Sequence, residues 1–327
     1  MFFVFGVLAG ALRSNLEIPP AIAKFLSLYL LMALGLKGGF ALAKSGLSPT
    51  VLLSLGAAML MAFIVPALGY QLLKNRVSRF DAAAIAASYG SVSAVTFVTA
   101  MQYLEANGMP PGGHMAAALV VMESPAIIMA VLLANTLRRA PVSAVSVAPS
   151  GAAALAGSGG PGPGTPLGKI LHESFTDGAQ LLLLGAMAVG FLSGEAGKAV
   201  MAPFSSDLFK GMLAFFLLDM GLMVARSFGS VRGQSVVLLA YASIGPLVHA
   251  AMALALAVVL QLPAADAALL MVLSASASYI VVPAVLRYAI PEAKPSLYLG
   301  LSLGVTFPLN ILLGIPLYTW VAGQALG

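Results

Sequence analysis

The sequence predicts an all-α membrane protein with about ten transmembrane helices, and three observations support this prediction. Of the 327 residues, 60% are hydrophobic and only 8% are charged, whereas a soluble domain has about 25% charged residues. The hydrophobic residues form runs close to the roughly 20 residues that a helix needs to cross a bilayer. A stretch rich in proline and glycine divides these runs into two sets of five.

Each set of apolar segments corresponds to one part of the predicted domain organisation. The first five-helix set lies within residues 1–137 and consists of segments 2–12, 25–43, 49–73, 82–104 and 115–137. Residues 138–168 are rich in Pro, Gly, Ala and Ser, a composition typical of a flexible linker. The second set lies within residues 169–327 and consists of segments 175–192, 208–225, 236–260, 267–286 and 297–321.

Lysine and arginine are distributed unevenly between the loops. If the N-terminus is outside, all but four of the 16 basic residues fall in the inner loops or the linker; the exceptions are Lys37, Lys44, Lys198 and Lys210. Cytoplasmic loops are enriched in Lys and Arg, so we expect a plasma-membrane protein with both termini outside and the linker in the cytoplasm. The basic residues form no cluster, which argues against nucleic acid as a partner.

Three pairs of landmarks indicate an internal repeat. Their separations are nearly equal, at 186, 185 and 183 positions, for Gly35 with Gly221, Ser93 with Ser278, and Pro125 with Pro308. A near-constant separation is the signature of a repeat. Since each half has an odd number of spans, the two halves have opposite orientations, so we expect two inverted five-helix repeats.

Two interrupted segments predict the binding site. Residues 88–99 and 274–283 place glycine and hydroxyl side chains inside apolar runs. A helix broken at such a point directs N–H groups and the positive end of its dipole at an anion. The expected site centres on Gly90 and the hydroxyls of Ser91, Ser93, Ser276 and Ser278. The alternative is that these small residues only allow helices to pack closely.

Two carboxylates lie well inside apolar segments, whereas the other acidic residues fall in loops or at helix ends, where they serve as solvated charges or caps. A carboxylate in mid-membrane costs about 2.5 to 3.5 kcal/mol, so it usually faces an ion, a partner or a cavity. Glu123 precedes Ser124-Pro125, and proline frees backbone carbonyls that suit sodium. The candidate sodium ligands are therefore Glu123 and four hydroxyls, those of Ser88, Thr96, Ser274 and Thr306. A hydrogen-bonded structural glutamate is the alternative, and the role of Asp219 stays open.

Several residue types and motifs are absent from the sequence, which argues against other classes of function. The chain has no cysteine, and it has no Walker motif, metal-ligand spacing or nucleophile elbow. We therefore expect no enzymatic activity, no cofactor and no metal other than sodium. His249 follows Gly245-Pro246, and a proton relay is one interpretation of it. Because it is a lone histidine with no carboxylate at helical spacing, it is interpreted as a packed polar residue. His114 and His172 lie at the edges of segments.

Five motifs resemble the sodium-dependent bicarbonate symporter family of the cyanobacterial type, in order along nearly the whole chain. They lie at Gly35 to Gly39, Tyr89 to Thr96, Glu123 to Asn135, Pro246 to His249 and Ala289 to Tyr298. The resemblance implies crossing broken helices, a core domain that moves against a gate domain, a homotrimer, and a small PII-like regulatory protein. It also implies an anion site made by Gly90, Ser91, Val92, Ser93, Ala275, Ser276, Ala277 and Ser278. Two positions depart from the family pattern, which has Asp in place of Glu123 and of Tyr279.

The leading hypothesis is a secondary transporter that imports bicarbonate or a similar small anion with sodium as the coupling ion. A proton-coupled organic-anion carrier and a cation/proton antiporter are the alternatives among transporters. The alternative outside the transporters is a membrane receptor that senses an anion without transporting it.

Overall fold

The computed structural model describes residues 1–46, 48–139, 178–231 and 233–327, and within these ranges the chain is helical with no strand. Arg138 and Arg139 belong to the last turn of helix α6, and the rest of the predicted linker lies outside the described residues. The prediction of an all-α protein is confirmed for the part of the chain that is described.

The first half contains six helices: α1 (Phe2–Ala11), α2 (Pro20–Ser45), α3 (Pro49–Leu73), α4 (Arg79–Gly90), α5 (Ala94–Ala106) and α6 (Met115–Arg139). The second half contains α8 (Gly178–Ala202), α9 (Leu208–Val231), α10 (Val236–Val259), α11 (Ala264–Ala275), α12 (Val281–Ala289), α13 (Pro295–Leu301), α14 (Phe307–Leu309) and α15 (Ile315–Leu326). Wide π-helical turns at Pro203–Asp207, Ser302–Thr306 and Asn310–Gly314 join α8 to α9, α13 to α14 and α14 to α15.

The helices follow the predicted apolar segments closely. Each of the ten segments is helical over most of its described length, and segments 82–104 and 267–286 are each broken into two helices. Among the described residues, six helical stretches are long and apolar enough to cross a membrane. These stretches are Pro20–Lys44, Pro49–Leu73, Arg79–Ala106, Leu181–Gly229, Val236–Val259 and Pro295–Leu326. The chain is thus a multi-pass membrane protein by length and composition.

Helices α1, α2, α8 and α9 form one group, which we call the panel. Within it, α2 packs along α8 and α1 packs along α9. Both pairs approach so closely that a Cβ atom has no room at the crossing: at Gly39 it would overlap the Met187 carbonyl, and at Gly221 the Phe3 carbonyl. Small residues allow this close packing of membrane helices.

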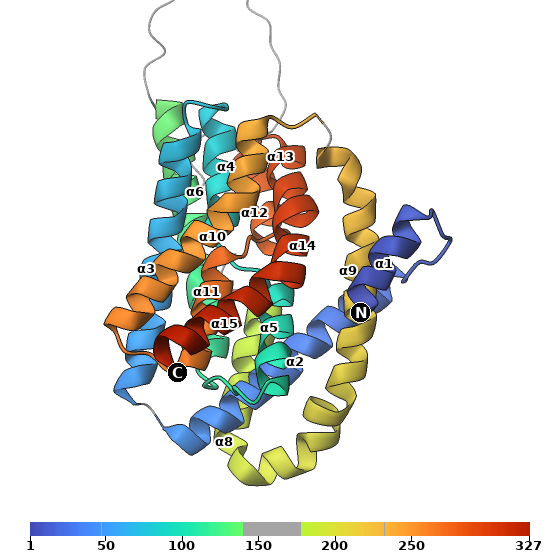
Figure 1. Ribbon diagram of the computed structural model, residues 1–327, viewed down its shortest axis with the longest axis vertical. Coiled ribbons are helices and arrows are strands. Elements are labelled where there is room, and N and C mark those ends of the chain that lie inside the picture. The colour runs from blue at the N-terminus through green and yellow to red at the C-terminus, as the bar shows by residue number, and fades with distance from the viewer. Residues whose placement is uncertain (47, 140–177, 232) are drawn as a thin grey trace, which may run out of the picture.

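The remaining helices, α3 to α6 and α10 to α15, form a second group, which we call the bundle. Here α3 packs against α4 and α6, α10 packs against α11, and α11 packs against α15. Figure 1 shows α3 and α4 of the bundle on the opposite side of the molecule from α1 and α9 of the panel. The two groups meet along α2, α8 and α9, and this interface holds the candidate site described below.

Two buried aspartates tie the halves of the bundle together. Asp81, in the first turn of α4, accepts a hydrogen bond from the backbone N–H of Lys294 at 2.8 Å. Asp266, in the first turn of α11, accepts one from the backbone N–H of Gly112 at 2.6 Å. Each carboxylate thus joins a helix of one half to the loop before the last span of the other half. Their position at helix starts was predicted, but their burial was not.

Candidate functional site

Both interrupted segments are broken in the structure, and the two breaks cross. Ser91 and Ser93 have extended backbone between α4 and α5, and Ser276 has extended backbone after α11. The N–H of Ser93 donates to Ser276 Oγ at 3.0 Å, and the N–H of Ser278 donates to the Ser88 carbonyl at 2.7 Å. The prediction that both segments are interrupted is confirmed, and the hydrogen bonds lock the two breaks to each other.

The two broken pairs run in opposite directions. In Figure 1, α4 lies above α5, whereas α11 lies below α12, so the chain descends through the first break and ascends through the second. The N-termini of α5 and α12 therefore meet the crossing from opposite sides. Ser93 caps α5 by accepting a hydrogen bond from the N–H of Thr96, and Ser278 Oγ accepts one from the N–H of Val282 in α12.

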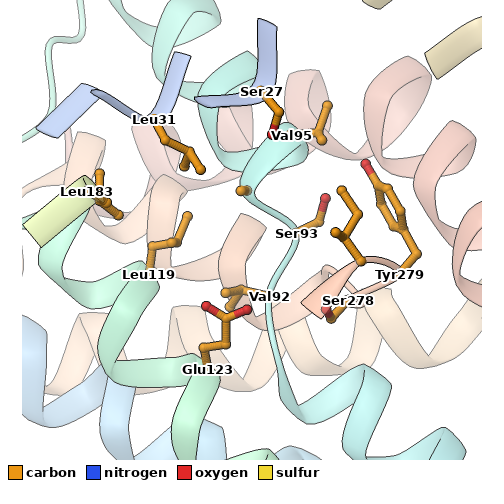
Figure 2. Close-up of a pocket in the computed structure, with 12 residues that line it drawn as sticks. Ser27, Leu31, Val92, Ser93, Val95, Leu119, Glu123, Leu183, Ser278 and Tyr279 are labelled. Atoms are coloured by element: carbon orange, nitrogen blue, oxygen red, sulfur yellow. The ribbon is translucent and has the colours of Figure 1, made fainter. Parts of the chain in front are cut away.

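A cavity lies at this crossing, between the bundle and the panel (Figure 2). Its volume is about 530 Å³, including the space at its open mouth. The panel contributes Ser27 and Leu31 from α2 and Leu183 from α8, and the bundle contributes the rest of the wall. The bundle residues are Val92, Ser93, Ala94, Val95, Leu119, Glu123, Ser278, Tyr279 and Ile280.

The start of α5 forms part of the cavity wall and offers hydrogen-bond donors. Within the described chain, no acceptor is found for the backbone N–H groups of Ala94 and Val95, which both line the cavity. Free N–H groups at the positive end of a helix dipole are a ready-made anion site. The lining contains no lysine or arginine among the described residues, so any positive potential from the wall comes from backbone N–H groups such as these.

Glu123 supplies the one carboxylate of the described lining. It lies on α6, is 4% exposed, and its carboxylate group lies near Val92 in Figure 2. Pro125 lies inside the same helix two residues later, where it removes a backbone hydrogen bond and frees a carbonyl oxygen. The site therefore combines a negative side chain with the N–H groups of α5.

The chain matches the family model of the Na+-dependent bicarbonate transporter superfamily over residues 1–323. The protein belongs to this superfamily. No curated protein matches the chain. Membership of a transporter superfamily agrees with the apolar spans and with a cavity at two broken helices, and the resemblance stated from the sequence is confirmed.

In this member of the superfamily, three of the eight predicted anion-site residues line the cavity, namely Val92, Ser93 and Ser278. Ser276 lies behind them, where its hydroxyl accepts from Ser93 and donates to the Leu273 carbonyl at 2.8 Å. Gly90, Ser91, Ala275 and Ala277 are buried at the crossing but are absent from the described lining.

Gly90 lies against a neighbouring helix, and its place in the anion site stays a prediction. A Cβ atom there would lie 2.5 to 2.7 Å from the ring carbons of Pro66 on α3. Gly90 does not have a positive φ, so the backbone conformation does not require glycine there. Gly90 therefore allows α4 to pack against α3, and close approach of a ligand is not needed to explain it.

Three of the four predicted sodium hydroxyls are buried without a hydrogen-bond partner in the described chain, namely those of Ser88, Thr96 and Ser274. Ser91 shares this property. An unsatisfied buried hydroxyl costs about 1 to 3 kcal/mol, so such groups usually have a ligand, an ion or a water as partner. All four lie within a helical turn of the hydrogen bonds that lock the crossing.

Thr306 does not share this arrangement. Its hydroxyl donates to the Ala242 carbonyl at 2.7 Å and accepts from Tyr89 Oη at 2.6 Å. Like Ser88, Thr96 and Ser274, it is absent from the described lining of the cavity. Its hydrogen bonds are satisfied by α10 and α4, so the structure gives Thr306 a packing role and does not bring it to Glu123.

The remaining polar candidates lie away from the cavity. Asp219 is on α9 of the panel and is 9% exposed, and it is absent from the lining. His249 is buried with its ring 6.3 Å from that of Tyr241, as expected for a packed polar residue. His114 faces Asp266, with 3.5 Å between Nε2 and the carboxylate; burial lowers the pKa of this histidine, and the carboxylate partly offsets the shift.

The panel side of the cavity was not foreseen from the sequence. Ser27, Leu31 and Leu183 come from helices that are distant in the chain from the interrupted segments. The one available signal was Ser27 itself, an isolated hydroxyl in the apolar run of α2. Leu31 and Leu183 gave no signal because any transmembrane helix is rich in leucine.

Proposed function

We propose that this protein imports bicarbonate, or a similar small monovalent anion, together with sodium. The observation that carries the proposal is the cavity at the crossing of two broken helices, where free N–H groups of α5 and the carboxylate of Glu123 share one wall. The superfamily to which the chain belongs supports bicarbonate and sodium as the transported species.

The anion is held by the first-turn N–H groups of α5 and by hydroxyls of the crossing, above all Ser93 and Ser278. No basic side chain is required for a single negative charge, because the helix end supplies partial positive charge. A divalent anion is disfavoured, since it would face Glu123 in a largely apolar wall without a compensating cation in the described lining.

Sodium couples to the anion through Glu123 and the orphan hydroxyls of Ser88, Thr96 and Ser274. An inside-negative potential opposes an entering unit anion by about 2.3 kcal/mol per 100 mV, and one sodium ion cancels this electrical term. A tenfold sodium gradient then contributes about 1.4 kcal/mol to uptake. Symport of one sodium with one anion is therefore sufficient for accumulation.

The proposal includes two inverted five-helix repeats, and the packing of the helices supports it. Contacts occur in related pairs: α1 on α9 and α2 on α8, then α3 on α4 and α10 on α11, then α4 on α6 and α11 on α15. Asp81 and Asp266, which are 185 positions apart, make related hydrogen bonds to the loops of the opposite halves. Each pair is what a twofold relation between the halves requires.

Transport by this arrangement requires the bundle to move against the panel, carrying the crossing with it. The two groups are joined near the predicted outer face by an ion pair between Lys37 on α2 and Glu105 on α5, with Nζ 3.2 Å from the carboxylate. In the same region, a Cβ atom at Gly38 would lie 2.9 Å from the carbonyl of Gly113. These contacts close that side of the interface, and movement of the bundle has to break them.

The experiment is uptake of labelled bicarbonate by the purified protein in sealed proteoliposomes, with and without a sodium gradient. Sodium-dependent accumulation is the expected result. Uptake that follows a pH gradient and ignores sodium would favour the proton-coupled alternatives, and anion binding without accumulation would favour a receptor.

The orientation in the membrane is a further part of the proposal, with both termini outside and the linker in the cytoplasm. Because the chain has no cysteine, single cysteines at Asn107 and Ser150 can be labelled cleanly with an impermeant maleimide on intact cells. Asn107 lies in the exposed loop after α5 and its φ is not positive, so cysteine can replace it without backbone strain. The next residue, Gly108, has a positive φ and is less suitable. We expect labelling at 107 only; labelling at 150 only would reverse the orientation.

The quaternary structure and the regulatory partner complete the proposal. A homotrimer, bound on the cytoplasmic side by a PII-like protein, is the assembly that the resemblance implies. Large apolar side chains are exposed along α1, including Phe2, Phe5 and Leu8, and they provide a surface for lipid or for a neighbouring copy. Native mass spectrometry of the detergent-solubilised protein measures the number of subunits directly.

A further inference from the structure

Tyr279 lies in the wall of the cavity, at the start of α12. It is 7% exposed and stands between Ser278 and Ile280, which also line the cavity. Figure 2 shows its hydroxyl beside that of Ser93, on the far side of the crossing from Glu123. The phenol group therefore belongs to the part of the cavity where the N-terminus of α5 presents its N–H groups.

The ring of Tyr279 is held firmly by other aromatic residues. It packs edge to face on Phe307, with 5.2 Å between the ring centres. Phe307 in turn packs edge to face on Phe3 of the panel, with 5.6 Å between the centres. Such pairs have a defined geometry, so the position of the Tyr279 hydroxyl is fixed before a ligand arrives.

The hydroxyl of Tyr279 contacts two side chains in the described chain, those of Met220 and Ser93. It donates to Met220 Sδ at 3.8 Å, and thioether sulfur is a weak acceptor. It also makes a side-chain hydrogen bond with Ser93, whose hydroxyl oxygen already accepts from the N–H of Thr96. A buried tyrosine O–H usually has a good partner. Since Ser93 and Tyr279 both line the cavity, a ligand oxygen there can replace Ser93 or Met220 as the acceptor for the Tyr279 hydroxyl.

The shape of an anion decides whether it can use this donor. A planar oxyanion has two or three oxygens, so one oxygen can accept from the N–H groups of α5 while another accepts from Tyr279. A halide is a single acceptor centre and cannot extend to both groups in the same way. Resting on the function proposed above, we propose that Tyr279 is a specificity-determining residue that favours planar monovalent oxyanions over halides.

The conservative substitution Tyr279→Phe tests this assignment because it removes the donor and keeps the ring on Phe307. The matched control is Tyr241→Phe, which removes another buried hydroxyl that has no hydrogen-bond partner in the described chain and does not line the cavity. The readouts are the half-saturation concentration and maximum rate of sodium-dependent bicarbonate uptake, and inhibition of this uptake by formate, nitrate and chloride.

Tyr279→Phe is expected to raise the half-saturation concentration for bicarbonate about tenfold or more, as for loss of one hydrogen bond to a charged acceptor. Inhibition by formate and nitrate should weaken to the same extent, whereas inhibition by chloride should stay as in the parent. Tyr241→Phe should leave the half-saturation concentration for bicarbonate and the inhibition by formate, nitrate and chloride unchanged. Tyr279→His, which restores a donor, should recover part of the preference for oxyanions.

Two results would overturn the assignment. One is a Tyr279→Phe protein whose half-saturation concentration for bicarbonate and order of inhibition by the three anions equal those of the parent. The other is a Tyr279→Phe protein with a lowered maximum rate and an unchanged order of inhibition, which indicates a structural role. If the parent itself shows no sodium-dependent bicarbonate uptake, the proposed function fails separately. Thermal stabilisation of the purified proteins by formate, nitrate and chloride then still measures whether Tyr279 sets the ranking. If the Phe variant is unstable, the ranking in Tyr279→His decides.

Discussion

Replacement of Glu123 by glutamine is expected to raise the sodium concentration for half-maximal uptake at least tenfold. Glu123 is the one carboxylate in the described wall of the cavity and is 4% exposed. Glutamine keeps the size of the side chain but removes the charge that attracts sodium. A hydrogen-bonded or coordinating charge contributes about 1.5 to 3 kcal/mol, which corresponds to roughly tenfold to 150-fold in affinity.

The measurement is the sodium dependence of bicarbonate uptake in proteoliposomes, repeated at a low and a saturating bicarbonate concentration. At saturating sodium, the half-saturation concentration for bicarbonate should change little, because the anion is held by the N-terminus of α5. Glu123→Asp keeps the charge and should retain sodium dependence, with weaker apparent affinity because the carboxylate is drawn back by one methylene group.

Asp219→Asn is the matched control, since Asp219 is also a carboxylate within a membrane helix but lies on α9 outside the lining. It should leave the sodium dependence unchanged. Normal sodium dependence in a well-folded Glu123→Gln protein would make Glu123 a structural residue. A shift in Asp219→Asn alone would transfer the coupling role to α9.

The breaks in the two central helices could be predicted from the sequence because their cause is local. Glycine and hydroxyl side chains inside apolar runs are costly against lipid, and residues 88–99 and 274–283 both carry them. The boundaries of the helices follow for the same reason, since a run of apolar residues ends where polar residues begin. Segment 49–73, for example, coincides with α3.

The composition of the cavity wall could not be predicted in the same way, because it depends on how distant helices pack. Ser27 and Leu183 meet the crossing only because α2 and α8 approach through glycine contacts and together face the bundle. Thr306 shows the converse case. Its hydroxyl resembles a ligand in the sequence, but the contact of Tyr89 and Ala242 with the turn after α13 uses its hydrogen bonds.

Gly90 has two possible explanations in the sequence, and the structure supports one of them directly. Glycine at a broken helix suggests either close approach of a ligand to the backbone or close approach of a neighbouring helix. The neighbouring residue is Pro66, whose ring lies where a side chain of residue 90 would be. The two explanations predict different effects of substitution, on anion affinity in one case and on stability in the other.

Gly90→Ala is accordingly expected to destabilise the protein by about 1 to 3 kcal/mol, the usual cost of overpacking, and Gly90→Val by more. The new Cβ atom would lie 2.5 to 2.7 Å from three ring carbons of Pro66, and a proline ring cannot rotate away. Gly56→Ala is the control, because a Cβ atom on that glycine of α3 meets no atom within 4 Å. Its effect should stay within about 0.5 kcal/mol.

A second substitution makes the test of Gly90 specific. Pro66→Gly removes the ring, so the double variant Gly90→Ala with Pro66→Gly should be more stable than the sum of the two single effects implies, by about 0.5 to 3 kcal/mol. Thermal unfolding of the purified proteins gives the stabilities, and uptake gives the anion affinity of each variant that folds. Additive effects, or a Gly90→Ala protein of normal stability with weakened anion affinity, would restore the explanation that Gly90 admits the ligand to the backbone.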